Sequence, residues 1–144
     1  MKRISLLVLA FAILAMPGVG LAKSKPPKAN KCQPHNAAYA VAGTLVSGTL
    51  APGTRKHTYT GTLVVHVTKA SKHAKSAKGT DQTYTLTNAH LKLHGENPAA
   101  LTMGSRVKLN GSITTLAKKC DQTGFTPTVT IKRGSIKAPK SHKH

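Results

Sequence analysis

Apolar and polar residues alternate through most of this chain, and this period of two restricts it to an all-β fold. The alternation is cleanest between residues 57 and 68, where apolar side chains share one strand face and threonine dominates the other. The inward residues of that strand are Tyr59, Leu63, Val65 and Val67, and the outward ones are Thr58, Thr60, Thr62 and His66. Gly and Pro interrupt the alternation at intervals, as turns between strands do.

The alternation predicts five strands, at about residues 39–50, 57–68, 82–93, 105–115 and 127–136. Pro52-Gly53 forms the centre of the turn between the first two. In the third strand, Leu86 and Leu91 have opposite parity, so they cannot both face the core of a regular strand. We therefore predict a bulge or break near Asn88 that resets the register.

A short helix is expected between the third and fourth strands, in "GENPAALTMG". Asn97 suits its N-cap, Pro98 its first turn and Gly104 its end. Five strands with a helix at this place is the order of an OB-fold barrel.

Two segments, "LKLHGENPAALTMGSRVKLNGSIT" and "AVAGTLVSGTL", resemble elements of secreted bacterial OB-like domains, of the kind found in families of unknown function. The resemblance covers about residues 37–138. It implies a small five-stranded barrel whose long, glycine-bent first strand is shared by both halves. An immunoglobulin-like β-sandwich is the alternative fold, although such a sandwich usually has about seven strands and a tryptophan that this chain lacks.

The first 22 residues have the form of a cleaved secretory signal peptide. Lys2 and Arg3 precede an apolar run from Leu6 to Met16, and Gly20-Leu21-Ala22 supplies the small residues that a signal peptidase needs. The apolar run is short for a membrane-spanning helix, and a retained anchor is the alternative. We expect a secreted or periplasmic protein with no transmembrane segment in its mature chain.

The mature chain has the size of one small domain, because 144 minus 22 leaves 122 residues. We divide it into a basic Lys/Pro-rich arm at 23–36, the OB-like barrel at 37–138 and a basic tail at 139–144. It has two cysteines, Cys32 and Cys120, and an even number in an exported protein favours a disulfide bond. A bridge that encloses most of the domain contributes about 4 kcal/mol to the free energy of unfolding.

Lysine and arginine far outnumber the acidic residues. The full chain has 22 Lys and Arg against 3 Asp and Glu, and removal of Lys2 and Arg3 leaves 20 against 3, or +17. Such a charge attracts polyanions and anionic surfaces over long range. We expect a binding module for an anionic polymer or cell-surface component, with nucleic acid, a teichoic-type polymer and an acidic polysaccharide as candidate partners. The predicted contact residues are Arg55, Lys56, Lys69, Lys72, Lys75, Lys78, Arg106, Lys108, Lys118, Lys119 and Lys132.

Four of these lysines, Lys69, Lys72, Lys75 and Lys78, recur every three residues in "TKASKHAKSAKGTDQ", residues 68–82. A polyproline-like conformation aligns this period on one side, whereas an α-helix spreads it over half of the surface. The stretch is either a ligand-binding loop or a solvated connection between the second and third strands. We interpret it as one mobile part of a diffuse cationic surface.

Aromatic side chains for stacking are scarce. OB-folds commonly bind ligands on the face of their second and third strands, and aromatic platforms usually hold single-stranded nucleic acid. The mature chain has only Tyr39, Tyr59, Tyr84 and Phe125, and strand parity puts the tyrosines on the apolar side. We therefore expect binding through non-specific charge and no recognition of bases.

No local signature of catalysis or of a cofactor is present. The acids Asp81, Glu96 and Asp121 fall on separate predicted elements, so we expect no enzyme, no catalytic residue and no cofactor. His90 and His94 share a strand face about 13 Å apart, which is too far for one ion. We expect no metal site.

The alternative function is a structural or protein-interaction module of the cell envelope. An exposed apolar patch would favour it. The apolar residues with outward parity are Val46 and Val64.

Overall fold

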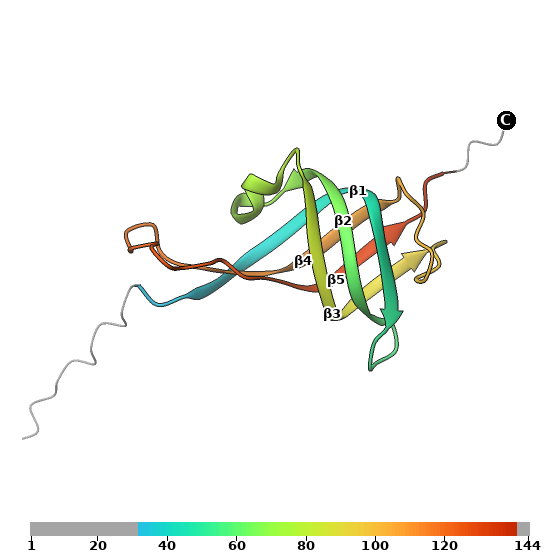
Figure 1. Ribbon diagram of the computed structural model, residues 1–144, viewed down its shortest axis with the longest axis horizontal. Coiled ribbons are helices and arrows are strands. Elements are labelled where there is room, and N and C mark those ends of the chain that lie inside the picture. Colours follow the sequence, from blue (N-terminus) through green and yellow to red (C-terminus); the bar gives the residue numbers. More distant parts are fainter. Residues whose placement is uncertain (1–31, 141–144) are drawn as a thin grey trace, which may run out of the picture. The chain divides into compact units, whose positions relative to one another are not determined.

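The computed structural model describes residues 32–140, which form five strands and one 3-10 helix (Figure 1). These elements are β1 (His35–Pro52), β2 (Thr58–Ala70), η1 (Lys72–Ala77), β3 (Asp81–His94), β4 (Arg106–Thr115) and β5 (Val129–Lys137). The signal peptide, most of the basic arm and the last four residues of the tail lie outside the described residues. β1 begins two residues before the predicted start of the barrel.

The five strands form one closed barrel in the order β1-β2-β3-β5-β4. Neighbouring strands are antiparallel except β3 and β5, which pair in parallel. The predicted five-stranded OB-like barrel is confirmed, and its closed sheet rules out the immunoglobulin-like sandwich.

β1 is long and bent, and it pairs with both β4 and β2. Its register with β4 runs from His35 to Thr44, and its register with β2 runs from Val41 to Pro52. Two register shifts interrupt its pairing with β2: Thr68 of β2 is the extra residue in the first, and Val46 of β1 is the extra residue in the second. A β-carbon at Gly43 would collide with the backbone carbonyl of His66, so this crossing of strands requires glycine. The predicted strand shared by both halves of the barrel is confirmed.

Most core residues are ones that strand parity places inward, while Leu50 and Ile136 reach the core only because register shifts change the parity of β1 and β5. Leu63, Val65 and Val67 of β2 are fully buried. In β3, Asn88 adopts a positive φ of 49°, and this break lets Leu86 and Leu91 both reach the core. The predicted reset of register near Asn88 is confirmed.

The predicted helix between the third and fourth strands is wrong. The segment contains a tight turn with an isolated bridge between Asn97 and Ala100. Its backbone is bound to β1 instead, since Leu50 N–H donates to the Pro98 carbonyl at 3.0 Å and Gly104 N–H donates to the Leu45 carbonyl at 2.8 Å. These long-range bonds use the groups that a helix would have paired internally.

Within residues 32–140 the one helix is η1, and it lies in the lysine stretch between β2 and β3. A 3-10 helix has three residues per turn, so residues three apart share a face. Ala74 and Ala77 are buried against the barrel, while Lys72 and Lys75 are exposed. The stretch is therefore neither polyproline-like nor α-helical, the two conformations compared for it, and its alanines pack against the barrel.

Two tyrosines form a hydrogen-bonded pair in the core. The hydroxyls of Tyr39 and Tyr84 lie 2.9 Å apart, and their rings meet edge to face with centroids 6.2 Å apart. The pKa of Tyr84 is raised well above its usual value near 10. Burial is the largest cause, and the hydrogen bond with Tyr39 is the second. Both residues are core residues, as their strand parity predicted.

We expect this pair to make the fold sensitive to alkali. The folded state keeps the Tyr84 proton above pH 10 while the unfolded chain releases it, so the free energy of unfolding falls as the pH rises above about 10. Tyrosinate absorbance should then show one phenol that ionises only together with loss of the fold. Tyr84→Phe provides the control, because it removes this titrating group. Ionisation of all three tyrosines while the barrel stays intact would contradict the prediction.

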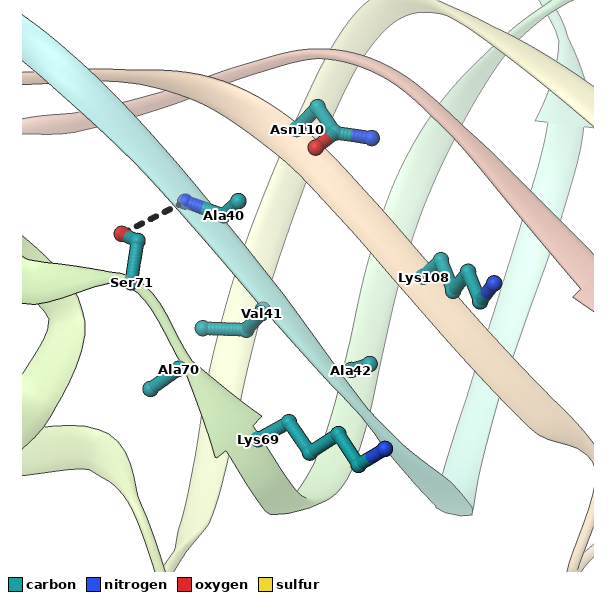
Figure 2. Close-up of a pocket in the computed structure, with 8 residues that line it drawn as sticks. All are labelled: Ala40, Val41, Ala42, Lys69, Ala70, Ser71, Lys108 and Asn110. Carbon is teal, nitrogen blue, oxygen red and sulfur yellow. Dashed lines mark hydrogen bonds between the residues drawn. The ribbon is translucent and has the colours of Figure 1, made fainter.

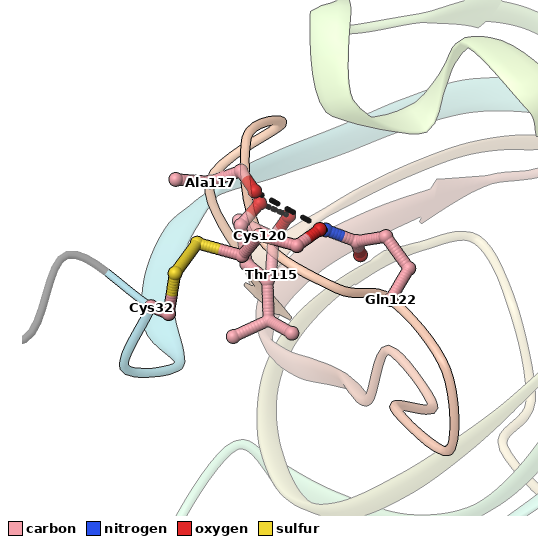
Figure 3. Close-up of a disulfide and its surroundings, with 6 residues drawn as sticks. Cys32, Thr115, Ala117, Cys120 and Gln122 are labelled. Atoms are coloured by element: carbon pink, nitrogen blue, oxygen red, sulfur yellow. Dashed lines mark hydrogen bonds between the residues drawn. A yellow bond between two sulfur atoms is a disulfide. The ribbon is translucent and has the colours of Figure 1, made fainter.

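The disulfide between Cys32 and Cys120 is confirmed; their Cα atoms are 5.4 Å apart, and the two residues are 88 positions apart in sequence (Figure 3). It links the residues before β1 to the loop after β4, where His35 and Thr115 end the β1–β4 ladder. Gln122 holds this loop together by donating to the carbonyls of Ala117 and Cys120, each at 3.2 Å. A disulfide is typical of proteins that fold outside the cytosol.

Candidate functional site

A shallow groove follows the outer side of the first half of β1. Its floor consists of alanines, because Ala38, Ala40 and Ala42 alternate with the buried Tyr39 and Val41. Three shallow hollows follow one another along this stretch, and the middle one shares residues with each of the other two. We call this feature the alanine groove.

Lysines border the alanine groove on both sides. Ala42 is paired with Lys69 of β2 on one side and with Lys108 of β4 on the other. Figure 2 shows Ala42 between these two side chains, with Ser71, Ala40 and Asn110 further along the same groove. The small alanines therefore leave the two long cationic side chains standing on either side of a channel.

β4 and β5 continue the positive surface. Arg106 is paired with Lys137, and Asn110 is paired with Arg133. A register shift between Asn110 and Gly111 inserts one extra residue in β5, and as a result the consecutive Lys132 and Arg133 are both exposed. We define the cationic face by six residues: Lys69, Arg106, Lys108, Lys132, Arg133 and Lys137.

The charge of the cationic face is not neutralised within the described residues. The one contact between a basic side chain and a carboxylate among residues 32–140 joins His66 to Asp81 at 2.7 Å. Glu96 accepts hydrogen bonds from the Ser105 hydroxyl and from Thr102 N–H. Hydrogen bonds from the side chain and then the N–H of Thr123 lower the pKa of the Asp121 carboxyl. All three acids thus bind local partners and leave the lysines and arginines without a carboxylate.

Few cations stand on β2 and β3, the strands on whose face OB-folds commonly bind: β2 has Lys69 near its end beside β1, and β3 has Lys92, which is paired with Ser135 of β5. The stretches 60–68 of β2 and 81–87 of β3 contain no Lys or Arg. Their outward positions are mostly threonine, and Thr62 is paired with Thr85 across the two strands. Most of the exposed cations of the strands therefore stand on β4 and β5, with Lys69 of β2 on the other side of β1, which itself has no Lys or Arg.

The eleven sequence-predicted contact residues fall into four groups. Lys69, Arg106, Lys108 and Lys132 belong to the cationic face. The remaining seven lie on η1 (Lys72, Lys75 with Lys78 just after it), in the β1–β2 turn (Arg55 and Lys56) and in the loop after β4 (Lys118 and Lys119).

η1 adjoins the alanine groove, since it begins directly after Ser71. Ser71 N–H donates to the Ala40 carbonyl at 2.8 Å, and Ala40 N–H donates to the Ser71 hydroxyl at 3.1 Å. The turn that carries Arg55 and Lys56 lies instead beyond the opposite end of β1, in a hollow with Asn88 and His90. The structure therefore gathers some predicted cations at the groove and sets others apart.

Two residues of the cationic face, Arg133 and Lys137, were not among the sequence-predicted contacts. Strict alternation from Ile131 gives Arg133 an inward position, and only the bulge turns it outward. The signal was present in the sequence, because Ile131 and Ile136 have opposite parity, as Leu86 and Leu91 do in β3.

Among residues 32–140, no group of three or more His, Cys, Asp or Glu side chains is placed to hold a metal ion. His57 and His90 have ring centroids 6.1 Å apart, but no third His, Cys, Asp or Glu of the same residues completes a group with them. In the same part of the chain, no helix has the length and hydropathy needed to span a bilayer.

No protein-family model, curated protein or solved structure matches the chain. The resemblance to secreted OB-like domains stays a prediction. So does the expectation that the protein has no enzymatic activity.

Proposed function

We propose that this protein is an exported, disulfide-closed binding module for an anionic polymer, and that the polymer lies on the cationic face along the alanine groove. The observation that carries the proposal is the set of six exposed basic residues on β2, β4 and β5, on both sides of β1, with no carboxylate partner among the described residues. Cations left unpaired on a surface attract a polyanion and release its condensed counterions on binding.

The lysines of η1 extend this positive surface from the edge of the groove, and both basic termini of the sequence add to the general field. The polymer is recognised by its charge, because no aromatic residue lines the groove except the buried Tyr39 beneath it. Export through the predicted signal peptide puts the protein in the compartment where disulfides persist and where anionic envelope polymers and released nucleic acid are found.

We expect the affinity to fall steeply with salt. Six contacted phosphates on a single chain give a slope of about −4 in log affinity against log salt, or a loss of roughly 300-fold between 50 and 200 mM. The measurement is the Kd of residues 23–144 for DNA, RNA, teichoic acid and an acidic glycan across this range. A neutral glycan is the control and should not bind. A Kd for these polyanions that does not change with salt would sink the proposal.

The envelope-interaction module is the weaker candidate because the part of the chain that the structure describes has no exposed apolar patch in its support. Met103 is the exposed large apolar residue among residues 32–140, at 73%. Val46 and Val64, the two outward apolar residues of the sequence, are half-buried. A protein partner retained at high salt would favour this candidate over polyanion binding.

A further inference from the structure

Resting on the proposed function, we propose that the alanine groove takes one extended phosphodiester chain that carries no bases, which is a polyol phosphate of the teichoic type. The groove's width, the spacing of its cations and its floor each bear on this choice. Nucleic acid is the competing ligand class that the experiment must separate from it.

The width of the groove fits a single chain. Lys69 and Lys108 stand on β2 and β4, the two strands that flank β1 at Ala42. Neighbouring strands lie about 4.8 Å apart, so the two lysine-bearing backbones are about 10 Å apart across the groove. A polymer chain one residue thick reaches both lysines from between them, whereas a duplex is too wide to enter and touches only the outer side chains.

The spacing of the cations fits a phosphodiester. Arg106 and Lys108 are two residues apart on β4 and share the outer face, a separation of about 6.8 Å by strand rise. Both nucleic acid and 1,3-linked poly(glycerol phosphate) have six bonds between successive phosphorus atoms. Since three backbone bonds of a polypeptide span about 3.5 Å, six such bonds span about 7 Å. Either chain, when extended, places successive phosphates opposite successive cations.

The alanine floor of the groove favours a polyol phosphate over a nucleic acid strand. A single nucleic acid strand drawn out to this length loses the stacking between its own bases, and proteins that hold such strands replace it with aromatic side chains. Here the floor offers the methyl groups of Ala38, Ala40 and Ala42, while Tyr39 and Tyr84 are buried. A polyol phosphate has no stacking to lose. Its hydroxyls lie within the same groove as the polar side chains of Ser71 and Asn110.

The test compares three probes with the same number of phosphates in the same buffer: 1,3-linked poly(glycerol phosphate), an all-abasic DNA and oligo(dA). We expect the first two to bind residues 23–144 with similar Kd, and both about tenfold or more tighter than oligo(dA), whose stacking must be broken. Oligo(dA) binding as tightly as the base-free probes would overturn this inference but leave the proposed function standing. Failure of all three to bind in a salt-dependent way would instead remove the proposed function.

Ala40→Trp adds the platform that the groove lacks, at an outward strand position where an aromatic residue is well tolerated. We expect it to raise the affinity for oligo(dA) about tenfold relative to that for the abasic probe, because the indole narrows the groove for both probes but stacks only with bases. Ala38→Trp repeats the test at the next position, and Thr85→Trp, on the threonine face, is the matched control and should change neither. A gain of oligo(dA) affinity in the Thr85 variant alone, or in none of the three variants, would show that the chain does not lie in the alanine groove.

Discussion

Replacing four cations of the cationic face by glutamine is expected to lower the affinity for a polyanion about 100-fold at 50 mM salt. The four are Lys69, Lys108, Lys132 and Arg133. Each exposed charge pair contributes about 0.2 to 1 kcal/mol, so four together contribute about 3 kcal/mol. The slope of log affinity against log salt should also become shallower by about 3 for a single-stranded ligand. Binding isotherms at several salt concentrations measure both quantities.

The matched control removes the same number of charges elsewhere. Glutamine at Arg55, Lys56, Lys118 and Lys119 gives the same net charge but leaves the cationic face intact. We expect the affinity of this variant for a polyanion to fall by less than about tenfold, because the substitutions weaken only the long-range field. Equal losses in the two variants would mean that charge acts diffusely, as the sequence alone had indicated, and that the face is no site.

Strand assignments were predictable because each depends on a local pattern. Alternation from Tyr59 to Val67 fixes which side chains of β2 are buried, and the parity change around Asn88 is visible without any knowledge of neighbouring strands. The turn at residues 97–100 was not predictable in this way. Its local sequence favours a helix, but its conformation is determined by hydrogen bonds to β1, which lies far away in the sequence.

The cationic face depends on pairings that no local pattern contains. Ala42 is an unremarkable residue in the sequence, and it becomes the floor of a groove only because Lys69 and Lys108 are its partners on two different strands. The lysine stretch is the opposite case, because its local pattern is conspicuous in the sequence. Its lysines recur every three residues, but Ala74 and Ala77 have the same spacing and form the side of the 3-10 helix that packs against the barrel.

Removing the disulfide is expected to lower the free energy of unfolding by about 4 kcal/mol. The bond joins residues separated by 88 positions, so its loss frees almost the whole domain in the unfolded state. For a domain of about 100 residues this corresponds to a fall in Tm of roughly 20 °C. The measurement is urea and thermal unfolding of the oxidised protein against the Cys32→Ala/Cys120→Ala variant, which avoids free thiols.

The same variant is expected to bind a polyanion at 25 °C with unchanged affinity. The β1–β4 ladder continues to His35 and Thr115 without help from the disulfide, and the alanine groove lies further inside that ladder. The loop after β4 also keeps its own hydrogen bonds, from Cys120 N–H and the Gln122 side chain to the Ala117 carbonyl. Loss of affinity in a variant that is still folded would mean that the disulfide holds the groove in shape. A fall in Tm below about 4 °C would mean that the ladder already restricts the unfolded chain.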